Sequence, residues 1–177
     1  ANFDFNQKTE LKGKRLRKLN YEEIFSNPLT EWNKNYERTI RAIKKHEGFS
    51  AESYICPGGY PTIGYGHLIK EDEAFTILTE KQADSLLRAD FDKSLAAVES
   101  SVKLEGHKKL AIAHFVFSKG IAAFNKSVLR LKVMNGENID SEIIKYCYYT
   151  DKDGNRVKSQ HALNIRKWEL RMFNLDS

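Results

Sequence analysis

The chain has 177 residues, of which 41% are hydrophobic, and its formal net charge is +5. A chain of this length can bury one sizeable core, so we expect a single compact domain, with a small lobe attached at most. No stretch approaches the roughly 18 consecutive apolar residues that span a bilayer, and no charged-then-apolar leader precedes a cleavage site. Export cannot be read from a chain that opens at Ala1.

Residues 1–27 are polar and basic and show no clear period. Six Lys or Arg residues stand against two acidic ones in the first twenty positions, an excess of four positive charges. We interpret this segment as an N-terminal arm that could contact a membrane or a protein partner, although a solvated arm explains it equally well. Aromatic residues do not alternate with the basic ones as they do in a nucleic-acid-binding module, so no nucleic-acid partner is expected.

A strong helix is predicted from Pro28 to Glu47. Ser26 or Asn27 can cap it, proline suits its first turn, and Gly48 stops it. Apolar residues recur along it at helical spacing: Leu29, Trp32, Tyr36, Ile40 and Ile43. This pattern places Glu47 on the last turn.

A glycine-rich hairpin follows this helix, with short strands predicted over 53–56 and 60–64 around a Pro-Gly-Gly turn. Its two strands would present the small polar side chains of Cys56 and Thr62 toward one space. A carboxyl at the junction of helix and strand, such as that of Glu47, can be partly desolvated and kept protonated. The arrangement suits cleavage of a glycosidic bond.

The rest of the chain is predicted to be mainly helical. Thr79 and Gln82 form a capping-box pair before a long apolar stripe that runs to Val98. Further helices are predicted over 107–119, 126–135, 140–148 and 159–173.

Metal and cofactor motifs are not complete in this sequence. His46 and Glu47 could begin a zinc protease helix, but Ser50 stands where the second histidine is needed. Residues 151–155 hint at a calcium loop, yet their glycine is misplaced and Ala162 occupies the position of the bidentate Glu, so we interpret them as a polar turn. We expect no metal and no cofactor.

One segment carries a family resemblance. Glu47 is followed nine positions later by Cys56 and six positions after that by Thr62, within the run Tyr-Pro-Thr-Ile-Gly-Tyr-Gly-His over 60–67. This resembles the signature of phage-type lysozymes and endolysins (glycoside hydrolase family 24), in which an acid is followed by Asp, or in some members Cys, and then by Thr. Weaker matches cover 78–90, 114–120 and 165–169, where Ser118 replaces the usual Asn and one of two arginines is lost.

The resemblance implies an α+β, lysozyme-like fold over residues 28–177. A small β-hairpin lobe and a mainly helical lobe would be joined by the long helix after Thr79, with the glycan strand between them. Leu68, Phe117 and Ser127 align with positions that line the glycan cleft. For Leu68 and Phe117, core packing is an equally good interpretation.

The implied activity is that of a muramidase, which hydrolyses the bond between N-acetylmuramic acid and N-acetylglucosamine in the bacterial cell wall. Glu47 would be the acid, with its pKa raised by burial near Phe49, unless a neighbouring cation counteracts that. Cys56 could orient water, act as a thiolate base or serve as nucleophile; we favour the first two, with Thr62 holding the water. A monomer is expected, acting in lysis of a phage host or as a bacterial toxin.

Three alternatives stay open. The loss of the usual Asp could leave a glycan-binding module that no longer turns over its substrate. The basic arm could be the functional element, tethering an enzyme to a membrane or partner. Cys56 and Cys147 could form one disulfide, but we expect two free thiols because a bond at Cys56 would obstruct the cleft.

Overall fold

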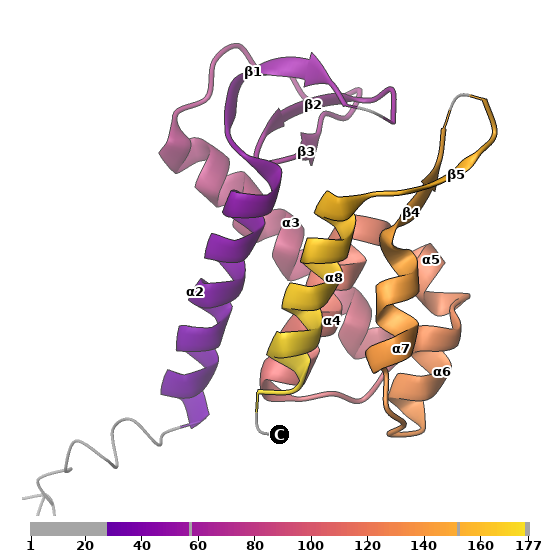
Figure 1. The fold of residues 1–177 in the computed structure, drawn as a ribbon. Coiled ribbons are helices and arrows are strands. Elements are labelled where there is room, and N and C mark those ends of the chain that lie inside the picture. Colours follow the sequence, from indigo (N-terminus) through magenta and orange to yellow (C-terminus); the bar gives the residue numbers. More distant parts are fainter. Residues whose placement is uncertain (1–27, 57, 152, 176–177) are drawn as a thin grey trace, which may run out of the picture.

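The computed structural model describes residues 28–56, 58–151 and 153–175, and the predicted arm over 1–27 lies outside them (Figure 1). The N-terminal part contains α2 (Pro28–Glu47), β1 (Ser50–Ile55), β2 (Pro61–Gly64), β3 (His67–Leu68) and α3 (Glu80–Ser101). The C-terminal part contains α4 (Gly106–Lys119), α5 (Ile121–Asn125), α6 (Val128–Met134), α7 (Asp140–Ile143), the 3₁₀ helix η1 (Ile144–Cys147), β4 (Tyr148–Thr150), β5 (Arg156–Lys158) and α8 (Gln160–Phe173).

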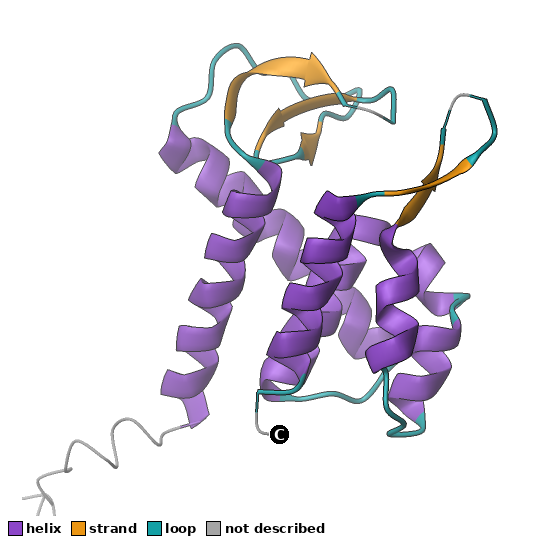
Figure 2. Ribbon diagram, viewed as in Figure 1, coloured by secondary structure: helices purple, strands orange, loops and turns teal. Residues whose placement is uncertain are grey.

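These elements form two lobes (Figure 2). The small lobe is the antiparallel sheet β1-β2-β3, which sits where the ends of α2 and α3 meet. The larger lobe consists of α4 to α8 with the hairpin β4–β5. The predicted α+β class, with a small sheet lobe and a helical lobe connected by a long helix, is confirmed.

Helix α2 ends where the sequence predicts. Ile40 and Ile43 of its apolar stripe are 1% exposed, so this face packs into the core. Gly48 then adopts φ +74°, and its amide donates to the carbonyl oxygen of Lys44 at 3.0 Å. A positive φ at this point is a common helix stop, and it turns the chain into the sheet directly after Glu47.

The sheet is larger than the predicted hairpin. Strand β1 starts at Ser50, three residues earlier than predicted, and an irregularity in its pairing lies between Ser50 and Tyr54. The third strand, β3, was not predicted; it pairs Leu68 with Thr62 and His67 with Ile63. A two-residue strand has too few positions to show alternation, but here it brings His67 and Leu68 alongside β2.

Helix α3 connects the two lobes through one apolar face. The capping box at its start is present as predicted: the Thr79 hydroxyl accepts from the Gln82 amide, and the Gln82 side chain accepts from the Thr79 amide. Its buried residues, which pack against the sheet at one end and the helical lobe at the other, are Ala83, Leu87, Phe91, Leu95 and Val98.

The helical lobe is organised around α4, in which seven successive residues from Leu110 to Val116 are buried. The helices predicted over 107–119, 126–135 and 159–173 correspond to α4, α6 and α8. The helix predicted over 140–148 is partly wrong, because the chain tightens into η1 and then enters β4 at Tyr148. The turn of the β4–β5 hairpin is the predicted polar turn, in which Asp151 Oδ1 accepts from the amides of Asp153 (2.9 Å) and Asn155 (2.8 Å).

Candidate active site

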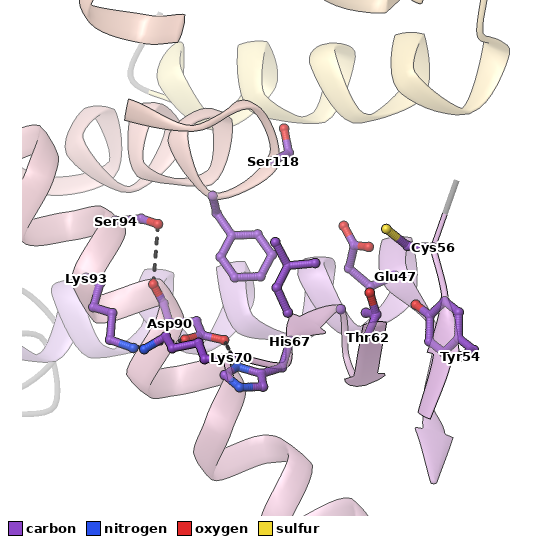
Figure 3. A pocket seen from close by; sticks show the side chains of 13 residues that line it. Glu47, Tyr54, Cys56, Thr62, His67, Lys70, Asp90, Lys93, Ser94 and Ser118 are labelled. Carbon is purple, nitrogen blue, oxygen red and sulfur yellow. Dashed lines mark hydrogen bonds and ion pairs between the residues drawn. The ribbon is translucent and has the colours of Figure 1, made fainter. Parts of the chain in front are cut away.

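A cleft of about 540 Å³ lies between the sheet and the helical lobe (Figure 3). Five of the six residues expected at a site line it: Glu47, Cys56, Thr62, Leu68 and Phe117. They are joined there by Tyr54, Gly66, His67, Lys70, Asp90, Lys93, Ser94 and Ser118. The cleft thus collects side chains from α2, the sheet, α3 and the last turn of α4.

Glu47 extends from the end of α2 into this cleft. Its carboxyl lies against the backbone of Gly66, so close that a Cβ there would stand 3.2 Å from Glu47 Oε2. The residue keeps an exposed surface toward the cleft, yet the protein around the carboxyl displaces water and raises the pKa of Glu47. Positive charge on His114 or His161 opposes this rise. Burial, the expected cause, is thus the largest influence on the pKa of Glu47.

Cys56 and Thr62 come together because β1 and β2 pair with Tyr54 opposite Thr62. The Tyr60 amide and the Thr62 hydroxyl face the sulfur and lower the pKa of the Cys56 thiol. Thr62 Oγ1 also lies 3.0 Å from the Tyr60 carbonyl oxygen. A hydroxyl has one proton, so Thr62 can donate to the sulfur or to this carbonyl, but not to both.

The reactive groups of these residues share one space. In Figure 3 the carboxyl of Glu47 and the sulfur of Cys56 point toward each other, with the Thr62 side chain nearby. Both cysteines are free, as expected, and Cys147 is buried away from solvent. An acid and a weakly acidic thiol, on separate elements and facing one cleft, can serve as a proton donor and a water-orienting group.

The sheet and the end of α4, which form two walls of the cleft, also present apolar surface. Leu68 is 52% exposed on β3. Phe117, at the end of α4, packs its ring against Phe91 with centroids 6.4 Å apart. Each can contact a sugar ring on one side and the protein on the other.

Ser127, the sixth expected residue, is not among the residues that line this cleft. The residue is buried, and its hydroxyl donates to the Phe124 carbonyl at 2.6 Å and accepts from the Arg130 amide at 3.0 Å. It is the N-cap of α6. A serine directly before a helix is typical of such a cap, which is the signal that identifies its role.

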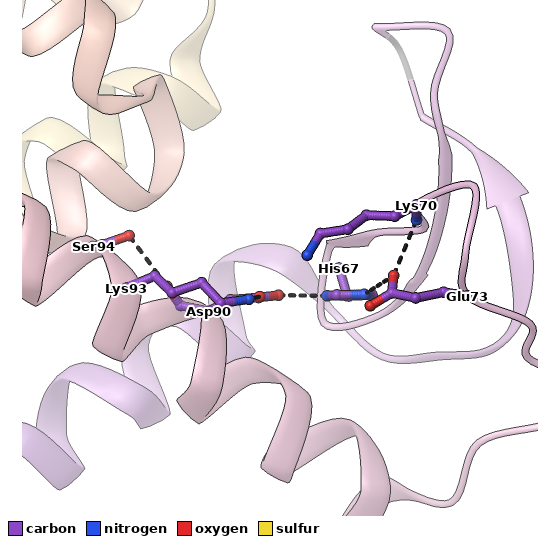
Figure 4. A network of polar contacts seen from close by, with 6 residues as sticks. All are labelled: His67, Lys70, Glu73, Asp90, Lys93 and Ser94. Carbon is purple, nitrogen blue, oxygen red and sulfur yellow. Dashed lines mark hydrogen bonds and ion pairs between the residues drawn. The ribbon is translucent and has the colours of Figure 1, made fainter.

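A cluster of polar contacts around His67, which includes Asp90, Glu73 and Lys70, lies at the sheet side of the cleft (Figure 4). It is the first of two histidine clusters. His67 Nδ1 lies 2.6 Å from Asp90 Oδ2, and Nε2 lies 2.9 Å from Glu73 Oε2. The Lys70 amide also donates to this Glu73 oxygen, at 3.0 Å. Burial alone would lower the pKa of His67, but the two carboxylates outweigh it and raise that pKa. Both ring nitrogens of His67 are thus within hydrogen-bond distance of a carboxylate.

A second histidine cluster, formed by Arg166, Glu169, His114 and His46, lies behind the cleft wall that α4 provides. Arg166 Nη2 donates to Ser118 Oγ at 2.5 Å and to Glu169 Oε1 at 2.8 Å. The same Glu169 oxygen lies 2.7 Å from His114 Nδ1, and His114 Nε2 lies 3.3 Å from His46 Nδ1. Arg166 and Glu169 are 1% and 0% exposed. This chain of contacts runs from the cleft surface at Ser118 to the residue preceding Glu47.

Sequence reasoning missed several of these residues. Asp90 sits on the predicted helix α3, but only the unpredicted strand β3 brings His67 to it. Ser118 was seen only as a departure from a family pattern, and Tyr54 as a strand residue.

Metal-binding clusters and membrane-spanning helices are absent from the part of the chain that the structure describes. No group of three His, Cys, Asp or Glu side chains there is placed to hold a metal ion. None of the described helices combines the length and apolar content needed to cross a bilayer.

Comparison with known proteins agrees with this geometry. The family model described as Phage lysozyme matches residues 44–168. An endolysin of Acyrthosiphon pisum secondary endosymbiont phage 1 is 32% identical over 141 residues, which are 77% of this chain and 95% of that protein.

Solved structures extend the likeness to the fold. An endolysin from Escherichia coli O157:H7 phage FAHEc1 superposes with a TM-score of 0.68 and 27% identity, over 77% of this chain and 90% of that one. The muramidase domain of SpmX from Asticaccaulis excentricus gives a TM-score of 0.70 and 26% identity, over 77% and 95%. With its α+β fold and the Glu-Cys-Thr cleft within the matched segment, the chain belongs to the phage lysozyme family.

Proposed function

We propose that the protein is a muramidase that hydrolyses the glycan strand of peptidoglycan between N-acetylmuramic acid and N-acetylglucosamine, with Glu47 as its acid. The observation that carries this assignment is a carboxyl with a raised pKa that faces a thiol and a hydroxyl in one interlobe cleft. The endolysin and muramidase names of the similar proteins support it. The protein then acts on the bacterial cell wall, and lysis of a phage host is the role that fits these relatives.

The chemistry follows from the three side chains. Glu47 donates its proton to the leaving glycosidic oxygen as the bond from the anomeric carbon breaks. Water adds to that carbon from the other side, and its proton passes to the Cys56 thiolate or to solvent. The lowered pKa of Cys56 makes a thiolate more accessible at neutral pH, and the Thr62 hydroxyl can hold the attacking water.

Replacement of the acid tests the proposal. Glu47→Gln keeps the size of the side chain but removes the proton, so hydrolysis of purified peptidoglycan should fall by about 10²- to 10⁴-fold. Mass analysis of the digest should show hydrated muropeptides for the wild type. Glu52→Gln is the matched control, since Glu52 is an exposed acid on β1 that does not line the cleft. Near wild-type hydrolysis by a folded Glu47→Gln variant contradicts the assignment.

Cys56 is tested by a pair of substitutions. Cys56→Ala should lose most of the activity, whereas Cys56→Asp should keep or raise it if the side chain directs water. The anomeric configuration of the first product separates the remaining roles: inversion supports water direction, and retention supports a covalent nucleophile.

A second function is favoured by one observation, namely the thiol at the position where the family usually has a carboxylate. A protein without turnover would bind the wall and stay on it. Clearing of a suspension of permeabilised cells supports hydrolysis, and cosedimentation with walls without clearing supports a binding module.

A further inference from the structure

A second cavity, here called the hairpin pocket, lies next to the glycan cleft on the helical lobe. Its volume is about 400 Å³, and it is lined by residues of α4, α7, η1 and the β4–β5 hairpin, among them Lys119, Glu142, Lys145, Tyr148, Tyr149 and Arg156. Ser118 lines the cleft and the next residue, Lys119, lines this pocket, so the two share the end of α4. In Figure 1 the hairpin rises from the helical lobe toward the level of the three-stranded sheet.

The pocket carries an excess of positive charge. Lys145 is neutralised by Glu142 at 2.7 Å, which leaves Lys119 and Arg156. Neither of these two has a carboxylate within ion-pair distance among the described residues. Burial, and after it the charge of Arg166 behind the pocket, lower the pKa of Lys119. An anion in the pocket would relieve the repulsion between these cations.

One aromatic ring of the pocket orients a cation. The guanidinium carbon of Arg156 lies 4.4 Å from the centre of the Tyr148 ring, so this ring face is already covered. Such stacking fixes the planar guanidinium and leaves its edge free to bind a carboxylate with two hydrogen bonds. The 3₁₀ helix η1 contributes Tyr146 to the pocket lining. The Tyr146 ring packs edge-on against Phe115, with centroids 5.0 Å apart, which anchors η1 on the core.

We propose that the hairpin pocket binds a carboxylate of the stem peptide carried by the glycan strand in the cleft. This inference rests on the proposed function. In peptidoglycan the peptide is joined to the lactyl group of muramic acid, so its carboxylates are tethered to a sugar that the cleft would hold. A cationic pocket that shares a wall with the cleft meets these groups at high effective concentration. The preferred substrate is therefore peptide-bearing glycan.

Removal of the two unpaired charges tests the site. Lys119→Gln/Arg156→Gln should raise KM for peptide-bearing glycan about tenfold, a change that corresponds to about 1.4 kcal/mol, and leave kcat unchanged. On the same strands after an amidase has removed the peptides, this variant and the wild type should have equal KM. Lys34→Gln/Lys81→Gln removes the same charge from exposed positions outside both cavities, and its KM should match the wild type on both substrates. An equal rise on both substrates, or no rise on either, overturns the proposal.

A binding measurement separates this proposal from the muramidase assignment. The free stem peptide, titrated into the wild-type protein, should bind about tenfold more tightly than the same peptide with amidated carboxylates. Equal binding of the two peptides refutes the pocket even if hydrolysis is observed. Absence of any hydrolysed glycan refutes the muramidase assignment even if the peptide binds. Displacement by a soluble wall phosphate polymer, but not by the peptide, would reassign the pocket to phosphate and overturn the proposal.

Discussion

Two histidine clusters flank the cleft, and they use the same contact in different surroundings. His67 and Asp90 are 2.6 Å apart, and His114 and Glu169 are 2.7 Å apart. The carboxylate side chains of the first cluster keep 22% and 26% of their surface exposed, whereas the Glu169 side chain is 0% exposed. The comparison teaches that distance alone does not set the importance of an ion pair. The solvent around its carboxylate decides what is lost when one partner is removed.

The buried cluster depends on a single oxygen atom. Glu169 Oε1 accepts from Arg166 Nη2 and is also the atom nearest to His114 Nδ1. Burial lowers the pKa of Arg166, and the charge of Glu169 opposes that effect. Arg166 Nε and Nη1 and Glu169 Oε2 have no hydrogen-bond partner among the described residues. The arginine charge therefore has one carboxylate to compensate it, in a region that water barely reaches.

The largest expected effect comes from breaking this buried cluster. Glu169→Gln leaves the Arg166 charge uncompensated, and the free energy of unfolding should fall by about 3–5 kcal/mol. Urea unfolding at neutral pH measures the change. Glu99→Gln is the control, because Glu99 pairs with Lys109 at 2.7 Å, close to the 2.8 Å between Arg166 and Glu169, but is 58% exposed. It should cost less than about 1 kcal/mol. Similar losses of unfolding free energy in both variants would show that burial does not set the cost of breaking an ion pair.

A smaller, pH-dependent effect is expected at the His67 cluster, whose carboxylates are partly exposed. The pKa of His67 is raised in the folded state, so its stabilising contacts are complete below its unfolded pKa and weaken as pH rises through the folded value. Asp90→Asn should therefore lower the free energy of unfolding by about 1.5–3 kcal/mol at pH 5.5, and by about 1 kcal/mol or less at pH 9. Urea unfolding at the two pH values measures this difference.

The His67→Gln background provides the control for this prediction. There the imidazole is gone, so Asp90→Asn should cost the same at both pH values. A persisting pH dependence in that background would show that another group, and not His67, titrates against Asp90.

The parts of the molecule that sequence predicts are those with a repeated pattern. Helices α2, α3, α4 and α8 carry apolar stripes over many turns, and the spacing of Glu47, Cys56 and Thr62 fixes three cleft residues. Strands β3, β4 and β5 have two or three residues each, too few for alternation to show. Both histidine clusters depend on contacts between segments that lie far apart in the sequence.

Ser127 carries a local signal that the family resemblance does not use. The N-cap pattern before α6 was present in the sequence, and it describes what the hydroxyl does. Asp90 and Arg166 could be predicted as helical residues. The contacts of Asp90 with His67 and of Arg166 with Ser118 could not, because a hydrogen bond across 23 or 48 positions leaves no local trace.

The smallest effect on stability is expected at Gly66, a residue with a positive φ whose backbone lies against the Glu47 carboxyl. Its φ is +84°, and a Cβ would stand 3.2 Å from Glu47 Oε2. Gly66→Ala should lower the free energy of unfolding by about 1–2 kcal/mol through the positive φ. The added methyl group also pushes the carboxyl away from its position, so kcat should fall, by less than the roughly 10²-fold that a 1 Å misplacement can cost.

Gly136→Ala separates backbone strain from displacement of the acid. Gly136 has φ +68° and nothing within 4 Å of a Cβ, so it should lose similar stability and keep the wild-type kcat. If both variants keep the wild-type kcat when fully folded, the Gly66 backbone does not position the acid. If only Gly66→Ala loses activity, contact between the Gly66 backbone and the carboxyl positions the acid, and the loss cannot be assigned to backbone strain, which both variants share.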